Sequence, residues 1–353
     1  MGKRKGLFLT SQMTGDRSQF EPGTLGAATL RSRRPPTRSL ALGRARRAVG
    51  RQAWLFVLVA LLVAGAGIAY DLAGGVRILT AASFWTPIGL GLGFLAALVR
   101  ELNRNTVTVL SNLGKHRGYT VLGAAPQLTD RALRELAPDR RSPFGCVAFQ
   151  PASPFATAFR DLQGVLREDQ VVAFIAPSHD EGATTSALCT AVAAAQQGRR
   201  VIVVDCDTRR RSLTKELGSN PSAGLLECCE EPQNWRSYIE EEPETGLHLM
   251  PAARMTNPWK TIVSSNGFAV LIGLLREHYD LVILDCPPAL RSGEGSILAS
   301  FADKAVAIAA WDQTAIPAIR QTVRTLQNRA GVRTAVYVNR VLPGFRFGRL
   351  RPD

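Results

Sequence analysis

Short apolar runs separated by helical stretches fill the second half of the chain. The runs lie at 171–176, 201–207, 247–252, 281–286, 304–310 and 335–339. Segments of helical composition, such as TTSALCTAVAAAQQ and FAVLIGLLREHY, separate several of them. Uniformly apolar strands that alternate with helices are typical of a parallel sheet that is covered on both faces. We therefore predict an α/β domain over residues 151–342, with a mostly parallel sheet and flanking helices.

Two longer apolar runs precede this domain. Residues 52–70 contain 19 positions without a charge, and residues 78–99 contain 22 more. About 20 apolar residues are enough to cross a bilayer as a helix. A cleaved signal peptide does not fit the first run, because its basic leader is long and a second run follows at once. A buried hairpin of a soluble protein would be less uniformly apolar. We predict two transmembrane helices over residues 53–100, joined by a short external loop.

The positive charge of the chain is concentrated in its N-terminal tail. Residues 1–52 carry 12 of the 43 Lys and Arg side chains but only two of the 29 acids. The same tail is rich in Gly, Ser, Pro and Arg and has no sustained periodicity, which is typical of disorder. Because an apolar segment begins directly after it, we interpret the tail as a membrane flank and expect no nucleic-acid partner.

The distribution of charge also predicts the orientation in the membrane. Basic residues precede the first apolar run, and Arg100, Arg104, Lys115 and Arg117 follow the second. Positively charged flanks stay in the cytoplasm, so both termini are predicted to be cytoplasmic. The remaining segments are a mixed linker over residues 101–150 and a basic tail over residues 343–353.

The cysteine and histidine residues give no sign of a metal centre. The six cysteines lack the paired spacing of a zinc site, and the four histidines form no cluster. We expect the cysteines to be small buried side chains in a reducing compartment.

Three predicted strand ends carry residues that are typical of a nucleotide site. The loop PSHDEGATT (177–185) joins a strand to a helix, where backbone N–H groups and the helix N-terminus can hold phosphates. Asp205 and Asp207 end the next strand, and Asp285 ends another, 80 positions after Asp205. Carboxylates at strand ends beside a phosphate loop can hold magnesium. The predicted loop residues are Glu181, Gly182, Ala183, Thr184 and Thr185, and the predicted magnesium ligands are Thr184, Asp205, Asp207 and Asp285.

The order of these motifs resembles that of one protein family. VVDCDTRR (203–210) is similar to the second Walker motif, and ILDCPP (283–288) to the Walker B motif, of the bacterial tyrosine kinases and polysaccharide co-polymerases. SPFATAFRDLQGVL (153–166), LMPAARMTNPW (249–259) and the pair Tyr279-Asp280 are also similar to segments of that family, as is the stretch over residues 101–126. The resemblance covers most of residues 50–340. It extends to the septum-site and partition ATPases, which are relatives of the family.

The resemblance implies a P-loop-type fold and a place in exopolysaccharide or capsule biosynthesis and export. It implies ATP and magnesium as cofactors and the bacterial inner (plasma) membrane as the location of a multi-pass protein. The implied partners are the membrane, a polysaccharide polymerase or the export machinery, and further copies of the chain in an oligomer.

The phosphate loop departs from the family pattern at its most important position. Ala183 stands where the family has a lysine that reaches the β- and γ-phosphates, and Asp180 adds a negative charge where the family commonly has glycine. Charge-assisted contacts of this kind contribute roughly 1.5–3 kcal/mol each, which corresponds to about one to two decades of affinity. The loss in phosphoryl transfer is expected to be larger, because charge stabilisation dominates that reaction.

Three further features differ from the family. Its Glu-x-x-Arg-x-x-Arg oligomerisation helix reads Thr157, Arg160, Gln163 here, with only the middle residue kept. Its C-terminal tyrosine cluster is missing, since the last tyrosine is Tyr337. Its large external domain is replaced by a short loop. We therefore predict weak or no nucleotide binding and assign no catalytic residue.

The sequence leaves three functions open. The first is a membrane-anchored, kinase-like scaffold or regulator of polysaccharide synthesis and export. The second is an active ATP-dependent tyrosine autokinase in which Arg209 or Arg210 replaces the lysine. The third is a partition-type ATPase, which as a rule lacks a two-helix anchor. The missing lysine and the tyrosine-free terminus favour the first.

Overall fold

The chain forms two compact units, residues 1–103 and 104–353. The computed structural model describes residues 57–75, 78–102, 106–107, 119–254, 262 and 266–342. The basic tails predicted over residues 1–52 and 343–353 therefore lie outside the described residues.

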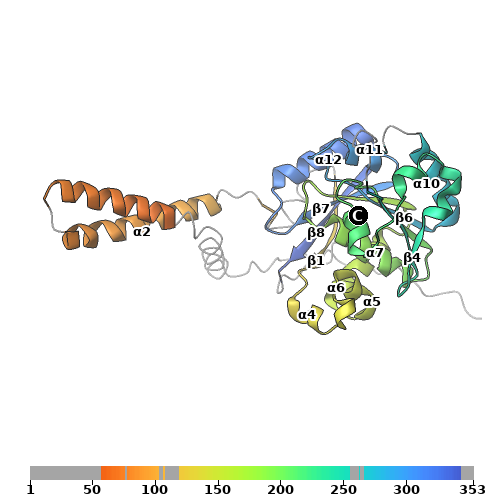
Figure 1. Ribbon diagram of the computed structural model, residues 1–353, viewed down its shortest axis with the longest axis horizontal. Helices are drawn as coiled ribbons and strands as arrows, with labels where there is room; N and C mark the ends of the chain where they lie inside the picture. Colours follow the sequence, from red (N-terminus) through yellow and green to blue (C-terminus); the bar gives the residue numbers. More distant parts are fainter. Residues whose placement is uncertain are drawn as a thin grey trace, which may run out of the picture. The chain divides into compact units, whose positions relative to one another are not determined.

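The described residues of the first unit form a helical hairpin (Figure 1). One helix covers residues 57–73, and the second, α2, covers Ile78–Leu102. A side-chain carbon added at Gly89 would lie 2.6 Å from the carbonyl oxygen of Ala60, so glycine allows the two backbones to approach here. The Trp85 indole N–H donates a hydrogen bond of 2.9 Å to the Asp71 carboxylate. The first contact joins the start of the first helix to the middle of α2, and the second joins the end of the first helix to an earlier part of α2. The two helices therefore run antiparallel.

Among the described residues, no helix combines the length and the apolar character that are needed to cross a membrane. The two spans predicted over residues 53–100 therefore stay a prediction.

The second unit contains an eight-stranded sheet whose order is β1-β8-β7-β2-β6-β3-β5-β4. All neighbouring strands are parallel except β4, which is antiparallel to β5. The strands are β1 Thr120–Pro126, β2 Val171–Ile175, β3 Val201–Asp205, β4 Glu240–Glu242, β5 Leu247–Met250, β6 Leu281–Asp285, β7 Lys304–Ala310 and β8 Arg333–Val341. The mostly parallel α/β fold predicted from the six apolar runs is thus confirmed.

Two edge strands differ from the sequence-based expectation. β1 lies in the segment predicted as a linker over residues 101–150, yet it pairs with β8 and extends the sheet by one strand. β4 consists of three glutamates and has no apolar residue that would mark it as a strand. β1 is held by backbone pairing with the distant strand β8, and β4 is held by antiparallel pairing with the next strand, β5. Neither pairing is revealed by a hydrophobic pattern.

Helices cover both faces of the sheet, as Figure 1 shows for α11 and α12 at the top of the view and α5 and α6 at the bottom. One buried cluster joins the sheet to α10, α11 and α12, and the other joins it to α5, α6 and α7. In β2, Val171, Ala173 and Ile175 face the first cluster, whereas Val172 and Phe174 face the second. This alternation explains why the strands are apolar at every position.

The helices of this unit are α4 Asp130–Arg134, α5 Pro143–Phe149, α6 Pro154–Val165, α7 Ala183–Ala195, α8 Ser212–Glu216, α9 Leu225–Cys228, α10 Gly267–His278, α11 Glu294–Ala299 and α12 Ile316–Ala330, with 3-10 turns at Pro138–Arg140 and Pro232–Tyr238. α7 follows β2 directly, and this connection creates the phosphate loop.

Candidate nucleotide site

The loop between β2 and α7 has the backbone shape of a phosphate loop. Gly182 precedes α7 with a φ of +93°, and a side-chain carbon there would lie 2.1 Å from the Asn339 amide nitrogen. Only glycine fits this position, for reasons of both conformation and space. Asp180 has a φ of +63°, a conformation that residues other than glycine seldom adopt. The loop thus places the N-terminus of the 13-residue helix α7 at the cavity.

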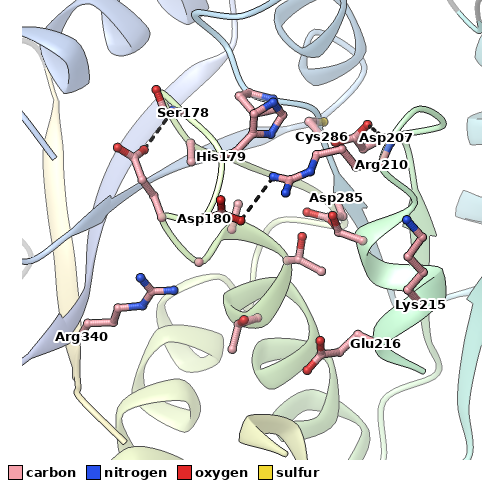
Figure 2. A pocket seen from close by; sticks show the side chains of 18 residues that line it. Ser178, His179, Asp180, Asp207, Arg210, Lys215, Glu216, Asp285, Cys286 and Arg340 are labelled. Carbon is pink, nitrogen blue, oxygen red and sulfur yellow. Dashed lines mark hydrogen bonds and ion pairs between the residues drawn. The ribbon is translucent and has the colours of Figure 1, made fainter. Parts of the chain in front are cut away.

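Glu181 forms a hydrogen bond within the phosphate loop. Its carboxylate accepts a hydrogen bond of 3.0 Å from the backbone N–H of Ser178 (Figure 2). Burial raises the pKa of Glu181, while the Ser178 N–H, the Thr314 hydroxyl and the Arg340 charge act in the opposite direction. The contact removes one backbone donor from the set that a phosphate loop offers to its ligand. Glu181 therefore stabilises the conformation of the loop.

Asp285 is a buried carboxyl group without a hydrogen-bond partner. It ends β6 beside Asp205 of β3, as expected for the carboxyl ends of parallel neighbours. Its side chain is 1% exposed, and neither oxygen accepts a hydrogen bond of ordinary length. Burial raises the pKa of Asp285 well above its usual range, the negative charges of Asp205 and Asp207 add to this, and the nearby Thr184 hydroxyl opposes it. A buried acid in this state fits a bound cation.

Asp205, by contrast, is fully engaged within the protein. It accepts hydrogen bonds from the Thr214 N–H at 2.9 Å, from the Thr214 hydroxyl at 2.6 Å and from the Asp207 N–H at 3.2 Å. Burial raises its pKa to about 6, although the hydrogen bonds from Thr214 lower it in part. These contacts fix α8 against the end of β3. Asp205 does not line the cavity. It was predicted as a magnesium ligand, but in the structure it holds α8 in position beside the cavity.

The remaining predicted residues meet around one cavity of about 420 Å³ (Figure 2). Those that line it are Glu181, Gly182, Ala183, Thr184, Thr185, Asp207 and Asp285. Thr184, Asp207 and Asp285 thus come from three elements that are far apart in sequence. They supply the oxygen ligands that magnesium prefers.

Three cationic side chains also line the cavity: Arg210, Lys215 and Arg340. Arg210 forms an ion pair of 3.3 Å with Asp180 of the phosphate loop (Figure 2). Arg340 donates a hydrogen bond of 3.3 Å to the Gln313 side chain. Of the two arginines that the sequence offered as replacements for the lysine, Arg210 is at the cavity, whereas Arg209 does not line it.

The α/β unit matches known proteins in sequence and in fold. Residues 170–334 match the family model described as an AAA domain. The chain is 24% identical over 289 residues to EpsB of Ralstonia nicotianae, which covers 77% of this chain and 38% of that protein. It is 24% identical over 266 residues to the succinoglycan biosynthesis transport protein ExoP of Rhizobium meliloti, which covers 67% of this chain and 34% of that protein. The chain is thus similar to the bacterial tyrosine kinases, chiefly over its α/β unit. It spans less than two fifths of the length of these two family members.

Solved kinase domains of this family share the fold. The kinase domain of the Escherichia coli tyrosine kinase ETK superposes with a TM-score of 0.61 at 20% identity, over 70% of this chain and 100% of that one. The BceF tyrosine kinase domain superposes with a TM-score of 0.57 at 20% identity, over 67% of this chain and 99% of that one. The P-loop-type fold that the resemblance implied is therefore confirmed.

Sequence reasoning missed Lys215 and Arg340 as residues of this cavity. Lys215 lies on α8, a helix of only five residues that has no periodic pattern. Arg340 lies near the end of β8 with a φ of +60°, where strand alternation gives no reliable direction for its side chain. The carboxyl end of β8 was the one available signal, because ligands of open α/β sheets bind at such ends.

Proposed function

We propose that this protein is a membrane-anchored, kinase-like scaffold or regulator of exopolysaccharide or capsule synthesis and export, with impaired catalysis. The observation that carries the proposal is Ala183, the first residue of α7, on the wall of a cavity that otherwise keeps the family's site. A methyl group there supplies no charge to a β- or γ-phosphate. Phosphoryl transfer depends mainly on such charge. The loss of the lysine therefore impairs phosphoryl transfer more than it impairs nucleotide binding.

ATP and magnesium are the proposed ligands. Asp285, Asp207 and Thr184 would hold the metal, and the unpartnered carboxylate of Asp285 is the group that fits it best. Magnesium held there would neutralise part of the phosphate charge. The N-terminus of α7 would face the phosphates. Weak affinity is expected, because Ala183 supplies no charge to the phosphates and Asp180 brings an acidic side chain to the same loop.

Two tyrosines of the α/β unit, Tyr337 and Tyr279, also support impaired catalysis. Tyr337 is buried, and its hydroxyl donates a hydrogen bond of 3.2 Å to the Ala158 carbonyl oxygen. The Tyr279 hydroxyl lies 2.6 Å from His248 Nδ1, and Tyr279 is 6% exposed. These hydroxyls are held inside the fold and are not presented as acceptors for a neighbouring site.

A membrane anchor is proposed for the first unit. Several apolar side chains of the hairpin are exposed, among them Leu61 at 67%, Leu62 at 63% and Phe84 at 60%. Exposed apolar patches of this kind mark membrane or protein contacts. We propose that both helices lie in the bacterial inner membrane with both termini in the cytoplasm, as the basic flanks predict. The partners would then be a polysaccharide polymerase or exporter and other copies of the chain.

The orientation predicts how single cysteines will label. A Gly74→Cys protein should react with a membrane-impermeant thiol reagent in cells whose outer membrane has been permeabilised. The site is suitable because a side-chain carbon at Gly74 meets only ordinary contacts, and the six native cysteines are buried. A Gln197→Cys protein, with its cysteine on the exposed end of the α/β unit, should react only after the inner membrane is opened. The reverse labelling pattern would overturn the topology.

The rival function, an active tyrosine autokinase, is favoured by Arg210 at the cavity and is tested by phosphate transfer. The full chain, purified in detergent and incubated with Mg·ATP labelled at the γ-phosphate, should incorporate no label on tyrosine. Arg210 is a poor substitute for the lysine, because its charge is already paired with Asp180. A solved family kinase of known activity provides the positive control. Incorporation of label on tyrosine would support the autokinase function and contradict the proposed loss of catalysis.

A further inference from the structure

The cations of the cavity differ in how they are engaged. Arg210 is paired with Asp180, and Arg340 is bonded to Gln313. Within the part of the chain that the structure describes, no acid forms an ion pair with the ammonium of Lys215, although its side chain lines the cavity. Figure 2 shows Lys215 extending from α8 on the side of the view opposite Arg340. Lys215 thus has a charge that is available to a ligand in the cavity.

The position of Lys215 is fixed by buried neighbours. Thr214, the preceding residue, is fully buried and donates hydrogen bonds from both its N–H and its hydroxyl to the Asp205 carboxylate. The same hydroxyl accepts a hydrogen bond of 2.9 Å from the Ala252 N–H. Leu213 is also fully buried. α8 is therefore anchored to the ends of β3 and β5, and it holds the backbone of Lys215 rigidly at the cavity wall.

The acidic side chains of the cavity favour a cation on α8 when an anionic ligand binds. Asp207, Asp285 and Glu216 line the wall near α8, and the loop residue that would carry the positive charge is Ala183. A nucleoside triphosphate brings several negative charges into this acidic surrounding. A lysine ammonium on a flexible four-carbon stem suits a phosphate as a point charge.

We propose that Lys215 replaces the missing loop lysine and binds the β- and γ-phosphates of a magnesium-bound nucleoside triphosphate from across the cavity. The inference rests on the proposed nucleotide site and names the residue that supplies its positive charge. It assigns Lys215 to binding, and phosphoryl transfer is not part of it.

Binding of Mg·ATP and AMP to the full chain in detergent tests the inference by calorimetry. The Lys215→Met protein should bind Mg·ATP about ten- to a hundredfold more weakly than the unaltered protein, because one charge-assisted contact is lost. Its affinity for AMP should not change, since AMP has no β- or γ-phosphate. Arg209→Met removes the same charge from the neighbouring loop without touching the cavity wall, and it should leave Mg·ATP affinity within about twofold, as expected for a screened surface charge. Lys215→Arg should retain most of the affinity.

A second comparison measures the effect of Lys215→Met in a protein that also carries Ala183→Lys. In the presence of Ala183→Lys, the Lys215→Met change should weaken Mg·ATP binding less than it does alone, because the two lysines serve the same phosphates. Unchanged Mg·ATP affinity in Lys215→Met, equal losses for ATP and AMP, or strictly additive effects would each overturn the assignment. So would the absence of Mg·ATP binding by the unaltered chain at millimolar concentration. None of these results would touch the scaffold function, which is decided by surface polysaccharide.

Discussion

Restoring the loop lysine by Ala183→Lys is expected to tighten Mg·ATP binding by the full chain at least about tenfold, as measured by calorimetry. Position 183 is the first residue of α7 and lines the cavity that also holds Asp207 and Asp285. The new ammonium would add one charge-assisted contact to the phosphates, worth roughly 1.5–3 kcal/mol. The metal-side carboxylates are already in place, so no further change is required for the gain.

A matched charge control separates this contact from a general electrostatic effect. Gln197→Lys adds the same charge in an exposed position beyond the C-terminal end of α7, and it should leave the affinity unchanged. The gain from Ala183→Lys should also be larger for ATP than for AMP. If Ala183→Lys folds normally but binds Mg·ATP no better than the unaltered protein, the loop is not a phosphate cradle and the nucleotide site is wrongly placed.

Much of the α/β fold was accessible from the sequence because its central strands are buried on both faces. Each of the six predicted runs is a strand of the sheet, since burial on both faces makes every position apolar. The meeting of Asp205 and Asp285 was accessible for a similar reason, because the carboxyl ends of parallel neighbours lie side by side. Both features follow from local pattern and strand direction alone.

The details that decide the chemistry depend on contacts between distant segments. β1 joins the sheet only through pairing with β8, more than 200 residues away in sequence. Asp205 was predicted as a magnesium ligand, but its role depends on Thr214, whose hydrogen bonds occupy both carboxylate oxygens together with the Asp207 N–H. The hydrogen bonds between Thr214 and Asp205 also position the neighbouring Lys215 at the cavity. No spacing along the chain distinguishes it from a solvent-exposed lysine.

The second large effect is a change in surface polysaccharide in cells that carry variants of the anchor or of the site. Deleting the gene should reduce surface polysaccharide, and the unaltered chain should restore it. A chain lacking residues 53–100 should fail to restore it, because the α/β unit would no longer be held beside membrane partners. The level of this variant must match that of the unaltered protein, so that failure reports the anchor and not degradation.

Asp285→Asn is the matching change at the site. Asp285 is buried without a hydrogen-bond partner, and burial holds its pKa well above the usual range. Burial thus disfavours the charged form of Asp285, and asparagine resembles the uncharged acid in size and shape. The substitution should cost little stability, while it removes the charge that magnesium needs. It thus separates the nucleotide chemistry of the site from the fold that carries it.

Surface polysaccharide in the deletion strain carrying Asp285→Asn is the measurement that tests the scaffold role most directly. If the domain acts by contact, this protein restores polysaccharide nearly in full at normal protein levels, whereas the chain without residues 53–100 does not. If the Asp285→Asn protein is present at normal levels and polysaccharide stays at the level of the deletion strain, the site performs chemistry and the scaffold account is wrong.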